Sequence, residues 1–318
     1  MSTLAFDGDV IVMTGAGGGM GRCHALELAR RGARVVVNDL GGHPFGGGSD
    51  ASLAEAVVEE IRAVGGEAVA NTESVSTPEG AASLTEQAMD QWGRLDAVVA
   101  NAAILRDRPF DEMTIQDFDD VIDVNFRGVM RVVHPAFKAM KAGGGGRIVT
   151  ITSSSGMLGA RQQANYAASK SGMLGLTRTI ALDGEQYGIK ANVLAPGALG
   201  TRMHLAVVES AGHHAEADAD LIQNEQAAEL LKPERVSPMV TVLTHATCPV
   251  TGEVLCAWGG WYGRFGITLN TGWADRVGIA TAEELVAHWD EIVDEASAHD
   301  AGLDAFAHGT RDAQDALS

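Results

Sequence analysis

The chain has 318 residues, of which 46% are hydrophobic, and its 42 acidic side chains outnumber the 23 basic ones, giving a formal net charge of −19. This length allows one large or two modest globular domains, and so acidic a surface excludes nucleic acid and anionic membranes as general partners. A ligand that carries phosphate must therefore be held by local groups.

Signals for export or membrane insertion are not found in the sequence. No stretch approaches the roughly 18 uninterrupted apolar residues of a membrane span, and the first ten residues lack a basic segment followed by an apolar one. Three widely spaced cysteines, Cys23, Cys248 and Cys256, suit buried thiols in a reducing compartment. The last residues do not match the peroxisomal tripeptide signal, so we expect a cytoplasmic protein.

Short runs rich in Val and Ile alternate along the chain with stretches of helical character. The runs are nearly unbroken by polar residues, which favours parallel strands that are covered on both faces. Their alternation with helices predicts an α/β fold of Rossmann type, a doubly wound parallel sheet with helices on both faces. The expected strands cover residues 9–15, 33–39, 95–103, 146–154 and 189–197.

Two helix starts carry clear capping signals. Thr77 followed by Pro78 predicts a capped helix that runs with apolar residues at helical spacing through Trp92. Near the end of the chain, Thr281 and Glu284 have the spacing of a capping box, and we expect one helix to follow them. This last helix is expected to pack on the main domain or on a partner subunit.

Two segments break the alternating pattern. The glycine-rich stretch 41–50 predicts a long loop, and the polar, Ala-rich stretch 201–233 predicts a mobile lid over the substrate. His213 and His214 in that stretch lack a recurring ligand spacing, so no metal site is expected. The sequence thus suggests a single catalytic domain over residues 1–262, lid included, and a C-terminal extension over residues 263–318.

A glycine-rich loop directly follows the first expected strand. Gly15, Gly19 and Gly21 precede a helix, and this arrangement lets a pyrophosphate approach the backbone and the positive end of the helix. Asp39 closes the next strand, where a carboxylate can accept hydrogen bonds from the ribose hydroxyls of NAD and repel the extra phosphate of NADP. The loop between Gly15 and Gly19 contains no arginine, so NAD is the expected cofactor.

Three further residues form a pattern that suits proton transfer. Tyr166 and Lys170 are four residues apart, on one face of an expected helix, and Ser153 lies at the carboxyl end of an expected strand. A tyrosine titrates near pH ~10, so its use as a base requires a nearby positive charge. Lys170 can supply that charge and is expected to lower the pKa of Tyr166.

These residues together resemble the short-chain dehydrogenase/reductase family. The resemblance covers roughly residues 8–262, and its motifs occur in family order. One motif departs from the usual Asn-Asn-Ala-Gly, because Ala100 and Ala103 replace its first and last residues. The matching segments are TGAGGGMG at 14–21, ANAA at 100–103, Asn125 within VNFRG, Ser153, Tyr166 with Lys170, and PGALGT at 196–201.

The resemblance implies a role for each matching residue. Tyr166 would accept the proton of a substrate hydroxyl, Ser153 would hydrogen-bond the same oxygen, Lys170 would assist Tyr166 and contact a ribose, and Asn125 would hold a water. The residues expected to bind the cofactor are Gly15, Gly19, Met20, Gly21, Asp39, Leu40, Ser74, Val75, Asn101, Ala102, Ala103, Tyr166, Lys170, Pro196, Gly197, Leu199 and Thr201.

A closer resemblance points to a substrate class. Several runs are similar to the dehydrogenase part of the peroxisomal multifunctional β-oxidation enzymes, and the similarity extends into the tail beyond residue 262. It implies a (3R)-hydroxyacyl-CoA as substrate and the 3-oxoacyl-CoA as product. These runs are 35–42, 57–71, 104–110, 163–170 and 230–238.

Two alternatives remain open at this point. A hydroxysteroid dehydrogenase would use the same constellation on a steroid alcohol, and a redox sensor would bind NAD without turnover. By analogy with the family we also expect a homodimer or homotetramer. An acidic protein needs local cations for the phosphates of CoA, and the candidates are Arg106, Arg108, Arg202, Lys232 and Arg235. Candidate contacts for the acyl or steroid portion are Met203, Leu205, Val207 and Val208.

Overall fold

The computed structural model describes residues 4–209, 224–275 and 279–303. The chain divides into two units, residues 1–264 and residues 265–318, whereas the sequence places the boundary after residue 262. Among the described helices, each is too short or too polar to cross a lipid bilayer.

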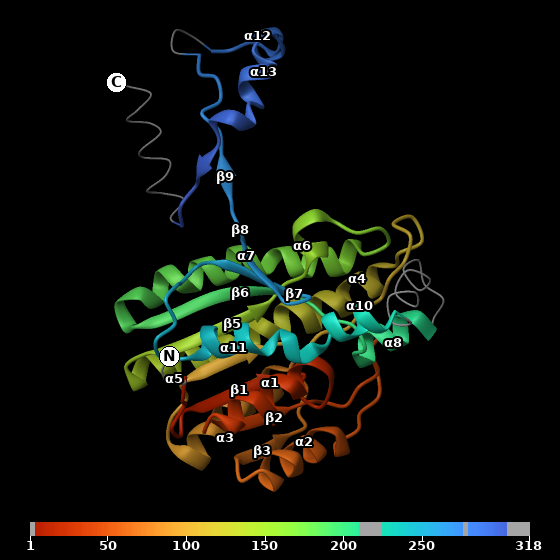
Figure 1. The fold of residues 1–318 in the computed structure, drawn as a ribbon. Helices are drawn as coiled ribbons and strands as arrows, with labels where there is room; N and C mark the ends of the chain where they lie inside the picture. Colours follow the sequence, from red (N-terminus) through yellow and green to blue (C-terminus); the bar gives the residue numbers. More distant parts are fainter. Residues whose placement is uncertain (1–3, 210–223, 276–278, 304–318) are drawn as a thin grey trace. The chain divides into compact units, whose positions relative to one another are not determined.

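An eight-stranded sheet forms the centre of the first unit (Figure 1). Its order is β3-β2-β1-β4-β5-β6-β7-β8, and the six neighbouring pairs from β3 to β7 are parallel. The order reverses between β1 and β4, as in the doubly wound fold that the sequence predicts. The strands are β1 (Val10–Thr14), β2 (Arg34–Asn38), β3 (Glu67–Asn71), β4 (Ala97–Ala100), β5 (Gly146–Ile151), β6 (Ile189–Gly197), β7 (Val254–Trp258) and β8 (Trp261–Phe265).

Two groups of helices accompany the sheet. Helix α1 contacts both α2 and α11, and in a second group α3 contacts α5 and α4 contacts α7. The bounds are α1 (Gly19–Arg30), α2 (Ser52–Ala63), α3 (Pro78–Trp92), α4 (Ile115–Ile122), α5 (Gly128–Gly143), α6 (Ser154–Leu158), α7 (Ala164–Gly184), α8 (Arg202–Glu209), α10 (Glu225–Leu230) and α11 (Ser237–Thr244). A π-helical turn, η1 (Asp123–Arg127), joins α4 to α5, and 3-10 turns span η2 (Glu185–Tyr187) and η3 (Pro233–Arg235).

The central strands are buried on both faces. All five residues of β1 and all four of β4 are shielded from solvent, without the alternation of a half-exposed strand. This is the pattern that helices on both sides of a parallel sheet require. Helix α3 begins as expected, because the Thr77 hydroxyl accepts a hydrogen bond from the backbone N–H of Gly80 at 3.1 Å.

Residues 265–318 form the second unit. Its described part contains a small antiparallel pair, β9 (Thr268–Leu269) with β10 (His299–Asp300), and two short helices, α12 (Ala282–Ala287) and α13 (Trp289–Ile292), before a 3-10 turn, η4 (Glu295–Ser297). The expected capping box is present, since Thr281 and Glu284 bond reciprocally. The expectation of one continuous last helix is wrong, because the helix breaks at His288, whose ring stacks on Trp273 at 4.3 Å.

Candidate active site

The loop between β1 and α1 is built from glycines for steric reasons. Gly15 has φ of +64°, and a Cβ there would lie 2.8 Å from the Cα of Ala102. A Cβ on Gly21 would lie 2.2 Å from the carbonyl oxygen of Gly15. Side chains are therefore excluded from the turn, and the backbone at Gly18 and Gly19 is bare where it borders the cavity. This bare loop at the start of a helix fits the pyrophosphate of a dinucleotide.

Asn101 holds the glycine loop from the neighbouring strand. Its side-chain amide donates to the carbonyl oxygens of Thr14 at 3.2 Å and Gly15 at 3.1 Å. In return, the Thr14 hydroxyl accepts hydrogen bonds from the backbone N–H groups of Asn101 and Ala102, both at 3.0 Å. Asn101 thus fixes the end of β1 against the end of β4, where the strand order reverses.

Asp39 closes β2 beside the glycine loop. Its Oδ2 accepts a hydrogen bond from the N–H of Gly17 at 2.8 Å, and its Oδ1 accepts one from the N–H of Gly41 at 2.7 Å. The guanidinium of Arg202, at the start of α8, donates to the same Oδ2 at 3.2 Å. The carboxylate that the sequence assigns to a ribose is therefore oriented by two backbone groups and paired with an arginine.

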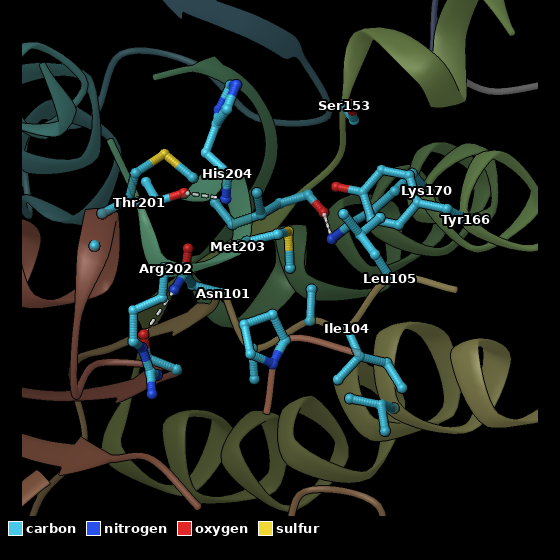
Figure 2. Close-up of a pocket in the computed structure, with 18 of the residues that line it drawn as sticks. Asn101, Ile104, Leu105, Ser153, Tyr166, Lys170, Thr201, Arg202, Met203 and His204 are labelled. Carbon is cyan, nitrogen blue, oxygen red and sulfur yellow. Dashed lines mark hydrogen bonds between the residues drawn. The ribbon is translucent and has the colours of Figure 1, made fainter. Parts of the chain in front are cut away.

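These elements surround one cavity of about 900 Å³, close to the upper end of the size range of ligand pockets. All but two of the residues expected to bind cofactor or to act in catalysis lie on its wall; the exceptions are Gly21 and Asn125, whose side chain lies behind it. Figure 2 shows Ser153, Tyr166 and Lys170 on one side, and Asn101, Thr201 and Arg202 on the other. Lining residues beyond the sequence expectation include His43, Pro44, Glu73, Leu158, Gln163 and Trp258.

Ser153 lies between β5 and α6, at the carboxyl edge of the sheet. Its Oγ caps α6 by accepting a hydrogen bond from the N–H of Ser155 at 3.2 Å. Because that bond uses a lone pair, the hydroxyl proton is available for donation into the cavity. Ser153 can therefore donate to an oxygen placed next to Tyr166.

Tyr166 and Lys170 project from the first turns of α7 into the same cavity (Figure 2). The ammonium of Lys170 lies 5.6 Å from the centroid of the Tyr166 ring and donates to the carbonyl oxygen of Ile151 at 2.9 Å. Burial lowers the pKa of Lys170 to about 8. The ammonium thus remains mostly charged at neutral pH, although it is buried.

The expected lowering of the Tyr166 pKa is wrong. Burial raises the pKa of Tyr166 to about 12, and a hydrogen bond with the Ser153 side chain and the charge of Asp107 act in opposite directions. Burial outweighs any effect of Lys170, whose ammonium donates to the carbonyl of Ile151. The phenol is therefore protonated at neutral pH until something else in the cavity stabilises its anion.

Asn125 lies in the π-helical turn η1 and is fully buried. Its amide accepts from the N–H of Ile104 at 2.8 Å and donates to the carbonyl of Ile104 at 2.9 Å, with a longer contact of 3.5 Å to the hydroxyl of Ser169. Such turns recur at functional sites, and this one ties the segment after β4 to α7. Asn125 therefore fixes the position of Ile104, a residue on the cavity wall, relative to α7.

Two polar residues near Tyr166 have no counterpart among the sequence expectations. The Gln163 side chain, at the start of α7, donates to Asp107 at 3.0 Å. Asn165 donates to the carbonyl of Arg106 at 2.8 Å, and the N–H of Arg108 donates to the carbonyl of Gln162 at 2.9 Å. The segment 104–110 is thus joined to the helix that carries Tyr166, and only contact between distant segments reveals it.

The cations proposed for CoA phosphates differ in their partners. Arg106 pairs with Asp120 at 2.6 Å, and Arg202 pairs with Asp39. Lys232 and Arg235 both pair with Glu229. Arg108 is exposed; its guanidinium makes a 3.5 Å contact with the carbonyl of Asp107, its charge helps to lower the pKa of Asp117, and it forms no salt bridge among the described residues.

The expected lid over residues 201–233 is described in part. Helix α8 places Met203 on the cavity wall, and Leu205 is exposed. Residues 210–223 lie outside the described residues, and with them His213 and His214; the side chains of Val207 and Val208 are likewise not described. Within the described ranges, no group of three or more His, Cys, Asp or Glu side chains could hold a metal ion.

Comparison with known proteins agrees with this architecture. The sequence matches the family model described as short chain dehydrogenase over residues 9–212. It is 42% identical over 295 residues to the peroxisomal multifunctional enzyme type 2 of Mus musculus, which covers 92% of this chain and 38% of the mouse protein. The chain thus spans less than half the length of that relative.

Two further relatives extend the comparison. A short-chain type dehydrogenase/reductase of Mycobacterium tuberculosis is 41% identical over 294 residues, covering 92% of this chain and 97% of the relative. The structure of the full-length peroxisomal multifunctional enzyme type 2 of Drosophila melanogaster superposes with a TM-score of 0.77 at 31% identity. That match covers 99% of this chain and 50% of the fly protein.

Proposed function

The chain belongs to the short-chain dehydrogenase family, and we propose that it oxidises a (3R)-hydroxyacyl-CoA to the 3-oxoacyl-CoA, with NAD as the hydride acceptor. The observation that carries this proposal is the convergence on one cavity of Ser153, Tyr166 and Lys170 with the bare glycine loop and Asp39. A substrate alcohol in this cavity would then lie next to its proton acceptor, Tyr166, to the ammonium of Lys170 and to the bound dinucleotide.

The side chains divide the reaction between them. NAD, when bound, supplies the acceptor for the hydride that leaves the carbinol carbon. Tyr166 would take the hydroxyl proton of the substrate, and the proton on Ser153 would hold the same oxygen as it becomes a carbonyl. The buried ammonium of Lys170 would stabilise the tyrosinate that oxidation requires, because charge interactions are strong where water is excluded.

Asp39 supports the choice of NAD. Its carboxylate borders the cavity beside the glycine loop, with both oxygens oriented by backbone N–H groups. Ribose hydroxyls can donate to such oxygens, and a 2′-phosphate would meet their negative charge.

The acyl-CoA assignment draws on relatives and on the rim of the cavity. The mouse multifunctional enzyme aligns over 92% of this chain, and the resemblance includes the segment 104–110 that borders the site. Leu158 lines the cavity although 77% of its surface is exposed, so it offers an apolar contact at the entrance. Arg108, whose guanidinium forms no salt bridge among the described residues, would contact a CoA phosphate.

A substrate and cofactor panel tests the proposal. Appearance of NADH is measured with (3R)- and (3S)-3-hydroxyacyl-CoA esters of several chain lengths and with steroid alcohols, each with NAD and with NADP. We expect the highest kcat/KM for a (3R)-hydroxyacyl-CoA with NAD. A higher kcat/KM for a steroid alcohol would replace this function by a hydroxysteroid dehydrogenase activity, and tight NAD binding without turnover on any alcohol would favour a redox sensor.

The cellular location, the oligomeric state and the domain bounds of the protein stay predictions from the sequence. The cytoplasmic location predicted from the sequence stays a prediction, and the names of the multifunctional relatives refer to peroxisomes. A homodimer or homotetramer, a C-terminal extension that packs on the core or on a partner subunit, and a catalytic domain over residues 1–262 also stay predictions. Sedimentation of the full chain measures the oligomeric state directly.

A further inference from the structure

Arg202 lies beside Asp39, the residue expected to distinguish NAD from NADP. It is the first residue of α8, 163 positions after Asp39, yet its Nη2 donates to Asp39 Oδ2 at 3.2 Å. Its Nε also lies over the glycine loop, 3.0 Å from where a Cβ of Gly18 would be. The guanidinium therefore lies between the loop and the acid, on the wall of the cavity.

The two charges of this pair differ in their exposure. The Asp39 side chain is 7% exposed and is held by the N–H groups of Gly17 and Gly41, whereas the Arg202 side chain is 41% exposed. The carboxylate is thus fixed, and the guanidinium can reorient toward the cavity while it stays near Asp39. Asp39 Oδ2 already accepts two hydrogen bonds, from Gly17 and Arg202, whereas Oδ1 accepts one, so Oδ1 keeps acceptor capacity for a ribose hydroxyl.

Arg202 is the cation suited to this part of the cavity. Among the described lining residues, the other Lys and Arg side chains are Arg106, which pairs with Asp120 at 2.6 Å, and Lys170, which bonds the carbonyl of Ile151. Guanidinium matches the geometry of a phosphate and remains charged at any physiological pH. A 2′-phosphate beside Asp39 would therefore meet Arg202.

We propose that Arg202 sets how strongly Asp39 discriminates against NADP. The inference rests on the proposed function, because it requires Asp39 to face the adenosine ribose. Arg202 neutralises part of the charge of Asp39 and offers donors to a 2′-phosphate, so NADP binds more weakly than NAD but is not rejected outright. An acid alone at this position would exclude NADP much more strongly.

Equilibrium binding without substrate tests the proposal on the full chain. Dissociation constants of NADH and NADPH are measured by fluorescence titration for the wild type, Arg202→Ala, Arg202→Lys, Asp39→Ala and the double variant. We expect Arg202→Ala to weaken the affinity for NADPH about tenfold and the affinity for NADH less than about threefold, with Arg202→Lys intermediate. Asp39→Ala should raise the affinity for NADPH about tenfold, and the double variant should lose that gain in affinity.

The outcomes separate this inference from the function it rests on. Equal changes in NADH and NADPH affinity on Arg202→Ala, or a gain in NADPH affinity that persists in the double variant, would overturn the role of Arg202 and leave the dehydrogenase assignment intact. Failure of the wild type to bind either dinucleotide would overturn both. Circular dichroism checks that each variant is folded, and Arg235→Ala, which removes a cation paired with Glu229, serves as the matched control.

Discussion

The ammonium of Lys170 lies 5.6 Å from the ring of Tyr166 and donates its hydrogen bond to the carbonyl of Ile151 instead. The charge is thus held beside the phenol but bonded to the backbone, and burial raises the pKa of Tyr166 to about 12. The phenol is therefore protonated at neutral pH. Oxidation of an alcohol therefore requires the bound reactants to complete the environment that stabilises its anion.

Replacement of Tyr166 by Phe removes the proton acceptor and little else. We expect turnover to fall at least about a hundredfold, the usual scale of general acid–base catalysis. The dissociation constant of NADH should change less than about threefold. Steady-state rates and fluorescence titration measure the two effects separately, and a variant with wild-type turnover would remove Tyr166 from the mechanism.

Replacement of Lys170 by Met should stabilise the protein without cofactor at pH 7. The pKa of Lys170 is lowered from 10.5 to about 8 by burial, so between these values the unfolded chain binds more protons than the folded one. Below pH ~8 the full cost of burying the charge is present, and it is relieved as pH rises toward ~10.5. The loss of the hydrogen bond to Ile151 offsets part of this gain. We therefore expect the free energy of unfolding of Lys170→Met to exceed that of the wild type by roughly 2 kcal/mol at pH 7.

Urea unfolding at pH 7 and at pH 10 tests this sign. The difference in the free energy of unfolding between Lys170→Met and the wild type should shrink at pH 10. The control Lys138→Met, at an exposed position, should alter the free energy of unfolding little at either pH. A variant that is less stable than the wild type at pH 7 would show that the ammonium contributes more through its bond than its burial costs. Turnover should be lost in Lys170→Met in every case.

His24 gives the fold an acid-sensitive element. It is buried in α1, its Nδ1 lies 2.8 Å from the hydroxyl of Ser237 in α11, and burial lowers its pKa to about 3. As pH falls through 6.5, the unfolded chain takes up a proton that the folded one does not, so stability is lost from there down to about pH 3. His24→Gln, which can keep a bond to Ser237, should remove this loss.

Unfolding free energies at pH 7 and pH 5 measure the effect. Between pH 7 and pH 5, the free energy of unfolding of the wild type should fall by about 2 kcal/mol more than that of His24→Gln. The exposed His134→Gln on α5 provides the control and should retain the wild-type loss. Identical pH dependence in the wild type and His24→Gln would assign the acid sensitivity to other groups.

Arg108 should act on the CoA part of the substrate alone. Its guanidinium forms no salt bridge among the described residues, although its charge helps to lower the pKa of Asp117, whereas Lys232 forms a salt bridge with Glu229. We expect Arg108→Ala to raise KM for a hydroxyacyl-CoA about fivefold. The KM for the matching N-acetylcysteamine thioester, which lacks phosphates, should stay unchanged, as should both values in Lys232→Ala. Equal effects on both esters would mean that Arg108 shapes the site rather than binding phosphate.

The sequence is most informative where local pattern decides the structure. The strands β1 and β2 are nearly continuous Val and Ile, so a parallel sheet buried on both faces could be predicted from them. The strands β3, with the sequence EAVAN, and β7, with the sequence VLCAW, each contain a single β-branched residue, so neither stands out. The break at His288 escaped prediction because the helical periodicity continues across it.

The site divides in the same way. Ser153, Tyr166 and Lys170 are close in sequence and could be placed together by helical spacing and strand ends. The pairing of Asp39 with Arg202 and of Asp107 with Gln163 joins distant segments, and no local pattern predicts it. Electrostatic balance likewise depends on burial, which is why the pKa of Tyr166 moves opposite to the expectation from its neighbour Lys170.

Transfer of a label from substrate to cofactor tests the central claim most directly. The enzyme is mixed with NAD and a (3R)-3-hydroxyacyl-CoA that carries deuterium on its carbinol carbon, and both products are analysed by mass spectrometry. We predict deuterated NADH in an amount equal to the 3-oxoacyl-CoA formed, and neither product with Tyr166→Phe. Unlabelled NADH, or deuterated NADH formed by Tyr166→Phe in the wild-type amount, would contradict the account.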